Sequence, residues 1–333
     1  MHREISARSP QLGAPQRLAG AHIDLTRQRR PGEMVVQAFL YLCAAVSIFT
    51  TIGIVVVLVN TAVHFFARPE VTFLDFLTGI SWQPRINAFG IWPLLLMTLL
   101  ISFIGMLIAL PVGLMIAIYL SEYAPPKVRS ALKPILEILA GVPTVVYGYF
   151  ALTFMTPLLR GLIGADVVQI YNVASAGLVV GILILPLVTS MSEDALRAVP
   201  MSLREAAYGV GATKLETSVS IVLPAALSGL AAAVIVAISR AIGETMVVAI
   251  AAGAGPRNFA SWGDAINNMA LVNPFTAGET MTGYMVRISG GDISYNSVDY
   301  DSLFAVGLVL FAMTLGLNIV SRRIVRRFRE VYE

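Results

Sequence analysis

Charge is scarce in this sequence. Asp, Glu, Lys and Arg make up 13% of its 333 residues, about half of the roughly 25% that soluble domains carry. Three stretches, 34–67, 89–121 and 150–159, contain none of these residues. An apolar stretch of roughly 20 residues spans a bilayer as a helix, which satisfies its own backbone hydrogen bonds. The composition therefore excludes a soluble globular protein and predicts an all-α integral membrane protein embedded in a lipid bilayer.

Several motifs of catalysis and nucleotide binding are also missing. The sequence has no Gly-Lys pair, and so no phosphate-cradling Walker A loop. It has no His-Glu-x-x-His, no Gly-x-Ser-x-Gly and no paired membrane aspartates. The one cysteine, Cys43, cannot form an internal disulfide. We therefore expect no enzymatic activity, no bound metal or cofactor and no nucleic-acid partner, so any ATP and Mg²⁺ would be used by a separate chain.

Six membrane-spanning helices are predicted from the apolar runs. They lie near 36–66, 91–120, 132–159, 174–197, 219–252 and 303–326. Seventeen Lys and Arg residues fall in the two termini and the 121–133 and 190–218 loops, against five in the remaining loops. Because cytoplasmic loops are enriched in Lys and Arg, both termini are expected in the cytoplasm. No cleavable signal peptide is evident in the first 33 residues.

The segments between the helices divide the chain further. Residues 1–33 read as a polar and mobile cytoplasmic tail, and 34–328 as the transmembrane domain. Within that domain, 198–224 forms a cytoplasmic loop. The 253–302 segment, rich in Gly, Pro, Asn and aromatics, reads as an ordered loop on the opposite, periplasmic side, with an amphipathic stretch near 264–288.

The 198–224 loop carries a spaced motif. Pro200 and Ser202 suit the start of a helix, and Glu205 follows Ser202 by three residues, as in a capping box. Two alanines after Glu205 would leave one helical face open to another protein surface, and Gly211 permits a tight bend. The motif residues are Glu205, Ala206, Ala207, Gly211, Ile221, Leu223 and Pro224.

This spacing resembles the EAA loop of permease subunits in ATP-binding-cassette importers. The resemblance implies the type I importer permease fold, and a helical knob that docks on an ATP-hydrolysing subunit and transmits its closure. An ordinary amphipathic interfacial helix would explain the charge and position of the loop, but not the placement of these seven residues.

Two charged residues are predicted inside the fifth spanning helix. An Arg at the centre of a spanning helix costs about 2.5–3.5 kcal/mol on insertion scales, and is usually kept for a cavity or a partner. Arg240 and Glu244 are four residues apart and can pair, with Ser239 and Thr245 beside them. An Arg fork suits a tetrahedral oxyanion. The pair therefore indicates either an anion path or gate, or an ion pair that locks helix packing.

A kink is predicted in the third spanning helix. Pro143 interrupts the stretch between Gly141 and Gly148. Thr144 and Tyr147 then either offer hydroxyls to the path or simply accompany a bend needed for packing.

The segment Arg-Ala-Ile-Gly-Glu-Thr-Met at 240–246 is similar to phosphate-specific permeases of the PstC type, as are 141–148, 205–213 and 303–311. The likeness covers about 35–325, and in that family the Arg and Glu matching Arg240 and Glu244 are implicated in transport. It implies a bacterial inner-membrane phosphate importer that works by alternating access. Its partners would be a second permease of the PstA type, an ATP-binding subunit dimer of the PstB type and a periplasmic phosphate-binding protein of the PstS type.

Other transport classes remain open at this point. A permease for another oxyanion, such as sulfate or molybdate, differs mainly at the 240–246 segment. A passive channel or secondary transporter does not require an EAA loop.

Overall fold

The computed structural model describes residues 31–267, 271–291, 294–295 and 297–327. The chain divides into two units at Gly53 and Ile54. Each unit is described by itself. The expected tail lies outside the described residues except for 31–33, which already belong to the first helix.

The first unit is helical throughout its described part. α1 (Pro31–Phe66) starts there and continues into the second unit. Glu33, in its first turn, precedes a run without Asp, Glu, Lys or Arg. Such a run meets the length and composition of a membrane span.

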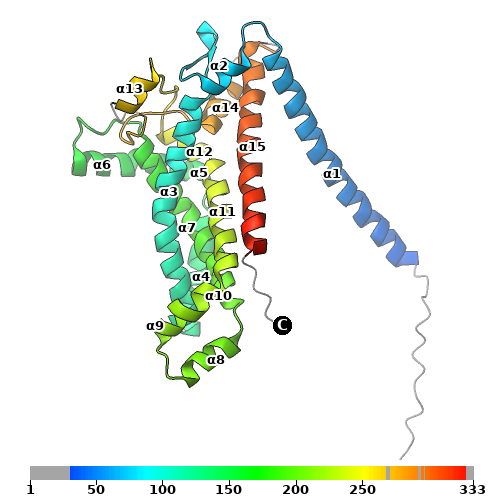
Figure 1. Cartoon of the computed structure of the whole chain (residues 1–333), viewed down its shortest axis with the longest axis vertical. Helices are drawn as coiled ribbons and strands as arrows, with labels where there is room; N and C mark the ends of the chain where they lie inside the picture. The colour runs from blue at the N-terminus through cyan, green and yellow to red at the C-terminus, as the bar shows by residue number, and fades with distance from the viewer. Residues whose placement is uncertain (1–30, 268–270, 292–293, 296, 328–333) are drawn as a thin grey trace, which may run out of the picture. The chain divides into compact units, whose positions relative to one another are not determined.

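The second unit holds the remaining helices and one short hairpin (Figure 1). In chain order its elements are α2 (Phe73–Thr78), β1 (Trp82–Gln83), η1 (Pro84–Ile86), β2 (Ala88–Phe89), α3 (Trp92–Ile118), η2 (Tyr119–Tyr123), α4 (Pro126–Gly141), α5 (Thr144–Phe150), η3 (Ala151–Met155), α6 (Thr156–Ile163), α7 (Val173–Arg197), α8 (Met201–Gly209), α9 (Lys214–Thr217), η4 (Ser218–Val222), α10 (Leu223–Ala225), α11 (Leu227–Ile242), α12 (Met246–Ala251), α13 (Trp262–Asn267), α14 (Met281–Ser289) and α15 (Val298–Arg327). Of these, η2, η3 and η4 are π-helical turns, and β1 pairs antiparallel with β2.

The main core of the second unit lies between α3, α7, α11 and α12. Its buried side chains include Met97, Ile101, Val180, Ile184 and Val248. The loop carrying α8 and α9 lies at one end of this helix bundle, and α2, α13 and α14 lie at the other (Figure 1). We call these the α8 end and the α14 end.

Glycines allow α3 and α7 to approach closely. A Cβ added at Gly181 would lie 2.8 Å from the main-chain oxygen of Gly105, and one at Gly177 would lie 2.8 Å from Ile104. Small residues at such contacts let helix backbones pack together in a membrane, where the hydrophobic effect contributes little.

We therefore expect Gly181→Ala to destabilise the protein by about 1–3 kcal/mol, because the added methyl group meets backbone that cannot rotate away. Thermal unfolding of the purified protein in detergent measures the change. Gly316→Ala is the matched control, since a Cβ at Gly316 of α15 meets nothing within 4 Å. Equal melting temperatures for the two variants would contradict the argument.

The third predicted span is fully broken at Pro143, where the sequence predicts a kink within one helix. The predicted helix at 132–159 is instead α4, α5, η3 and α6, and the candidate span within it runs from Thr144 to Ile163. Pro143 lacks a backbone N–H and, with φ −57° and ψ 136°, sits outside the helical region. α4 is thereby separated as an amphipathic helix.

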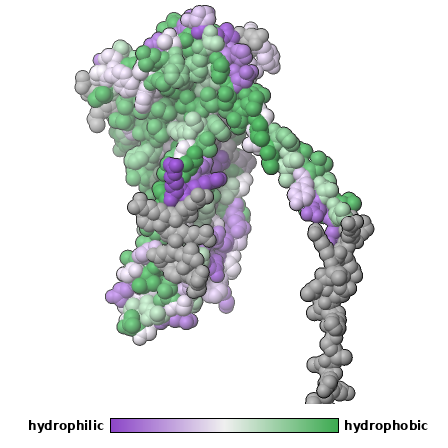
Figure 2. All heavy atoms as spheres, turned by 45° about the vertical axis from the view of Figure 1, so that its right-hand side comes forward, coloured by the Kyte–Doolittle hydropathy of each residue, from purple (hydrophilic) through white to green (hydrophobic). Residues whose placement is uncertain are grey.

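The fifth predicted span is also segmented. The 219–252 stretch comprises part of η4, then α10, α11 and α12, and the helices on either side of Ala226 differ in direction by 71°. Five helices meet the criteria for a membrane span in the described chain, or six when this bent pair counts as one. Figure 2 shows a broad hydrophobic area on the second unit, with hydrophilic residues gathered at its upper rim and toward its lower end.

Charged side chains order the α14 end. Arg68 binds Asp301 at 2.6 Å, and Arg287 binds Glu279 at 2.6 Å. The Arg257 guanidinium donates to the main-chain oxygens of Asn273, Thr276 and Ala277 at 2.7–3.0 Å. Burial lowers the pKa of Arg257 to about 10, so the group stays charged at neutral pH. The expected loop at 253–302 contains α13, α14 and the first turn of α15. α14 overlaps the amphipathic stretch expected near 264–288.

Candidate functional site

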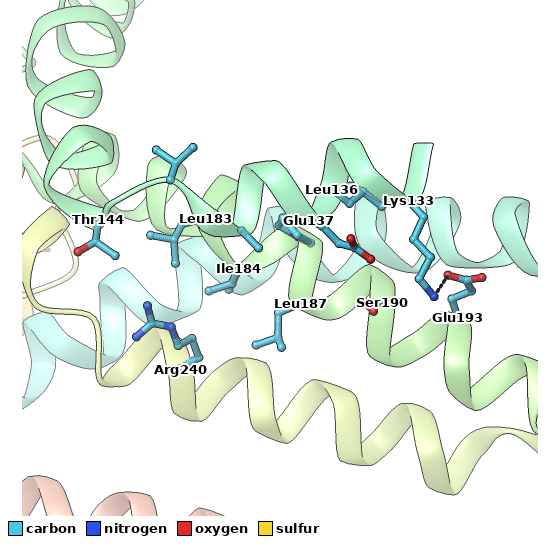
Figure 3. Close-up of a pocket in the computed structure, with 13 residues that line it drawn as sticks. Lys133, Leu136, Glu137, Thr144, Leu183, Ile184, Leu187, Ser190, Glu193 and Arg240 are labelled. Atoms are coloured by element: carbon cyan, nitrogen blue, oxygen red, sulfur yellow. Dashed lines mark ion pairs between the residues drawn. The ribbon is translucent and has the colours of Figure 1, made fainter. Parts of the chain in front are cut away.

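A cavity of about 340 Å³ opens on the second unit beside α4, α7 and α11. Figure 3 shows Arg240 and Thr144 toward one end of it, and Lys133 and Glu193 toward the other. Apolar side chains of α7, including Leu183 and Leu187, lie between the two ends. The cavity therefore has two charged regions separated by an apolar wall.

Arg240 presents its guanidinium to this cavity. The side chain is 48% exposed, whereas that of Glu244 is 2% exposed. The Arg240 Nη2 and Glu244 Oε2 atoms are 3.4 Å apart, longer than the roughly 2.7–2.9 Å of a charge-assisted hydrogen bond. The pair is thus electrostatic and loose, and the guanidinium keeps donors for an anion in the cavity.

The helix breaks between Arg240 and Glu244. α11 ends at Ile242, Gly243 follows it, and α12 starts at Met246. Gly243 disfavours helix by about 1 kcal/mol relative to Ala, and a carboxylate is favourable near the start of the next helix. The sequence predicts that Arg240 and Glu244 share one face of a continuous helix. In the structure they pair across a break between two helices.

Two contacts fix Glu244 behind the cavity. Its Oε1 accepts from the backbone N–H of Val247 at 3.4 Å, and its main-chain oxygen accepts from the Thr282 hydroxyl at 2.8 Å. Its Oε2 is buried and accepts no hydrogen bond from the residues that the structure describes. The cationic group beside this oxygen is the Arg240 guanidinium, at 3.4 Å.

The other residues predicted to line the path do not all lie in this cavity. Thr144 lines the same cavity as Arg240. The Tyr147 hydroxyl is directed elsewhere, since it donates to the main-chain oxygen of Leu139 at 2.7 Å. Thr245 lines a different cavity of about 630 Å³. The Ser239 hydroxyl is buried without a hydrogen-bond partner in the described part of the chain.

A buried carboxylate at the other end of the cavity was not predicted as a site residue. Glu193, near the end of α7, is 1% exposed and forms an ion pair with Arg129. Lys133 Nζ lies 3.7 Å from its Oε2, and Arg197 Nη1 lies 3.9 Å from its Oε1. The sequence carries one signal for it: Glu193 is the first charge after the uncharged stretch 173–192.

The Glu205–Pro224 loop folds as two short helices joined by a turn. Pro200 is the N-cap of α8, so Ser202 lies inside the helix and makes no side-chain cap. The capping box instead forms at α9, between Thr213 and Glu216. The φ of Gly211 is +89°, which only glycine adopts readily, and it turns the chain between the helices.

The motif residues of this loop face in two directions. Glu205, Ala206, Ile221 and Pro224 are exposed, whereas Ala207 is buried. Leu223 packs against the buried cluster around Ala117 and Leu196. The exposed residues leave one side of the loop open to another protein.

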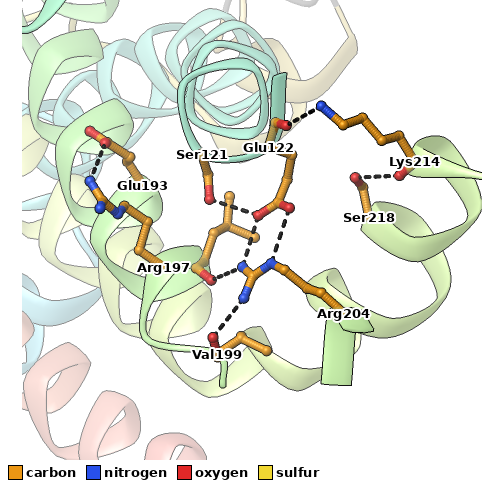
Figure 4. A network of polar contacts seen from close by, with 9 residues as sticks. Ser121, Glu122, Glu193, Arg197, Val199, Arg204, Lys214 and Ser218 are labelled. Atoms are coloured by element: carbon orange, nitrogen blue, oxygen red, sulfur yellow. Dashed lines mark hydrogen bonds and ion pairs between the residues drawn. The ribbon is translucent and has the colours of Figure 1, made fainter. Parts of the chain in front are cut away.

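An ion pair joins this loop to η2, the π-helical turn that continues α3 (Figure 4). Arg204 donates to both carboxylate oxygens of Glu122, at 2.9 and 3.2 Å, and to the main-chain oxygens of Leu196 and Val199 at 2.9 and 2.6 Å. Lys214 donates to the Glu122 main-chain oxygen at 3.3 Å. Sequence reasoning missed this pair, although Glu122 is the first charge after the uncharged stretch 89–121.

Comparisons with known proteins agree with this arrangement. Residues 109–330 match the family described as binding-protein-dependent transport system inner membrane component. The chain is 31% identical to the probable ABC transporter permease protein YqgH of Bacillus subtilis, over 85% of this chain and 86% of that one. It is 30% identical to the phosphate transport system permease protein PstC of Mesorhizobium japonicum, over 76% and 78%.

A solved structure shows the same fold. It is an inward-facing form of the MetNI methionine ABC transporter, with a TM-score of 0.50 and 24% sequence identity. The match covers 72% of this chain and 95% of that chain.

Proposed function

This chain belongs to the family of binding-protein-dependent transport system inner membrane components, and from that membership we propose that it is the permease subunit of an ATP-driven phosphate importer. Relatives named as phosphate permeases cover most of the chain. The observation that carries the proposal is Arg240, a half-exposed guanidinium facing a cavity inside an inner-membrane protein.

The site chemistry favours phosphate over other oxyanions. A guanidinium binds a tetrahedral oxyanion through paired N–H donors. Hydrogen phosphate carries a proton that it can donate. The buried Glu244 Oε2 receives no hydrogen bond among the described residues and lies 3.4 Å from the Arg240 guanidinium. Sulfate and molybdate carry no proton at neutral pH, so they cannot donate a hydrogen bond to a carboxylate as hydrogen phosphate can.

ATP binding and hydrolysis are assigned to a separate subunit, and this chain is assigned no catalytic role or cofactor. The exposed side of the α8–α9 loop, with Glu205 and Ala206, is the proposed docking surface for that ATPase. The excess of Lys and Arg in the two termini and in the 121–133 and 190–218 loops supports a cytoplasmic position for these segments, which include α8 and α9.

The complete importer would contain a second permease of the PstA type, a PstB-type ATPase dimer and a PstS-type periplasmic phosphate-binding protein. The binding protein would dock at the α14 end. Closure of the ATPases would draw the α8–α9 loops together and open the helix bundle toward the periplasm. Phosphate would enter beside Arg240, and ATP hydrolysis would return the bundle to its inward-facing state.

Reconstitution of the full complex in vesicles, with its binding protein, tests the proposal. We expect uptake of radiolabelled phosphate to require ATP, and to be unaffected by collapse of ion gradients. An excess of unlabelled sulfate is the specificity control and should not compete. Uptake that follows an ion gradient, or that sulfate suppresses as strongly as phosphate does, would contradict the assignment.

A further inference from the structure

We propose that the cavity contains a second oxyanion site, at the end opposite Arg240, which receives phosphate before its release. Arg129, Lys133 and Arg197 form this site around the buried Glu193. The proposal rests on the proposed function and adds a second position on the path inside this chain. We call these four residues the basic cluster.

Burial divides the basic cluster into an inner anion and outer cations. The Glu193 side chain is 1% exposed, whereas those of Arg129, Lys133 and Arg197 are 23%, 36% and 49% exposed. The carboxylate therefore lies behind the cations, and their outer faces remain accessible. The charge that these four residues expose is therefore positive.

Of the three cations, Arg129 lies closest to Glu193. The 3.7 and 3.9 Å separations of Lys133 and Arg197 from Glu193 exceed hydrogen-bond distance. Lys133 also lies 3.9 Å from Asp194, whose side chain is 69% exposed. Lys133 and Arg197 thus retain N–H donors that a phosphate oxygen can accept, and water screens the exposed Asp194 charge.

Two cavities meet at the basic cluster. Lys133 and Glu193 line the cavity that also holds Arg240. A second cavity of about 370 Å³ is lined by Arg129, Lys133 and Arg197, together with the end of α3. Lys133 borders both cavities, so an anion held there can be reached from either one.

The lining of the middle of the cavity, between Arg240 and the basic cluster, disfavours an anion. Leu183, Ile184 and Leu187 form it, and Glu137 adds a negative charge (Figure 3). Burial of an unpaired charge against apolar groups is costly. Phosphate would therefore reside at Arg240 or at the basic cluster rather than between them, so the wall acts as the barrier between two stations.

A phospholipid headgroup offers the same phosphate chemistry and could reach the exposed cations from the bilayer. The shared cavity with Arg240 favours free phosphate, because one continuous space connects the two basic regions. Lipid composition separates the two sources experimentally.

The test measures equilibrium binding of radiolabelled inorganic phosphate to the full complex in nanodiscs, without ATP or binding protein. All variants carry Arg240→Gln, so that the first station is removed. We expect Lys133→Gln with Arg197→Gln to weaken phosphate binding about tenfold or more. This pair of changes leaves the Arg129–Glu193 ion pair intact, which protects the fold.

Two further variants distinguish an anion site from a structural ion pair. Glu193→Gln removes the competing carboxylate and should tighten phosphate binding several-fold, whereas a purely structural cluster would lose binding or stability in this variant. Lys133→Arg with Arg197→Lys keeps the charges and should bind as the parent does. Lys127→Gln, an exposed residue of α4 that lines neither cavity, is the matched control and should change nothing.

Each contrary result identifies what fails. If the Lys133→Gln, Arg197→Gln variant binds phosphate as its parent does, the second site is wrong, while phosphate uptake by the unaltered complex would leave the proposed function standing. If phosphate binding disappears in nanodiscs containing phosphatidylglycerol but persists in phosphatidylcholine, a lipid headgroup occupies the cluster and the release site is overturned. If the unaltered complex takes up no phosphate, both proposals fall.

Discussion

Replacement of Arg240 by glutamine will abolish ATP-driven phosphate uptake while the importer still assembles. The variant keeps the length and polarity of the side chain but loses the positive charge. The guanidinium is half-exposed in its cavity and only loosely paired with Glu244, so most of its electrostatic attraction is available to the transported anion. Loss of one partner of a charged contact costs about 2–5 kcal/mol, which corresponds to a fall in uptake of about 30-fold or more.

The competing explanation is that Arg240 and Glu244 lock helix packing. The double variant Arg240→Gln, Glu244→Gln separates the two. A packing lock predicts recovery of uptake in the double variant, because no buried charge is then left alone. A role in the anion path predicts that uptake stays absent.

Co-purification of the ATPase and its basal hydrolysis rate report assembly in these variants. Arg322→Gln, an exposed residue of α15, is the control for loss of one positive charge. Uptake at the unaltered rate in Arg240→Gln would remove Arg240 from the path.

The long apolar elements were predictable from sequence. α7 runs from Val173 to Arg197, against a predicted 174–197, and α3 with η2 covers the predicted 91–120. These helices are specified locally, because a long run without charge has to satisfy its backbone hydrogen bonds within the bilayer. The spaced residues of the 198–224 loop likewise indicated the family, which the comparison over 109–330 confirms.

Breaks and long-range pairs were harder to predict. Whether Pro143 or Gly243 bends or ends a helix depends on the helices packed around it, so the predicted spans 132–159 and 219–252 were too continuous. Glu193 meets Arg129 only because α4 lies beside α7, a placement that local pattern does not encode. The roles of Arg240, Glu244 and the loop residues stay predictions.

Replacement of Arg204 by leucine will uncouple the α8–α9 loop from the helix bundle. Arg204 and Glu122 are both nearly buried, and the guanidinium bonds at once to the carboxylate and to two carbonyls at the end of α7 and just beyond it. Removal of one partner of a buried pair costs about 3–5 kcal/mol, because the remaining charge loses its compensation. We expect uptake to fall at least about tenfold, since α8 would no longer be held against the end of α3.

Uptake relative to ATP hydrolysis measures this coupling. In Arg204→Leu, the hydrolysis rate per phosphate transported should rise, or the ATPase should no longer co-purify. Lys214→Leu is the matched control in the same loop. This exposed lysine donates one long hydrogen bond, of 3.3 Å, to the Glu122 main-chain oxygen and lies 5.7 Å from the centre of the Tyr123 ring, so its loss should change uptake little. Arg204→Lys should fail almost as fully as Arg204→Leu, since one ammonium cannot reproduce the forked contact with Glu122 and both carbonyls.

The double variant Glu122→Leu, Arg204→Leu shows whether the pair acts through stability alone. An apolar pair of similar volume often restores the stability lost with a buried ion pair, so the double variant should melt closer to the unaltered protein than Arg204→Leu does. The carbonyls of Leu196 and Val199 would still lack their donor, and the loop would still lack its directional link to α3. We therefore expect thermal stability to recover in part and uptake to remain low. Recovery of both together would mean that the ion pair only stabilises the fold and does not transmit movement.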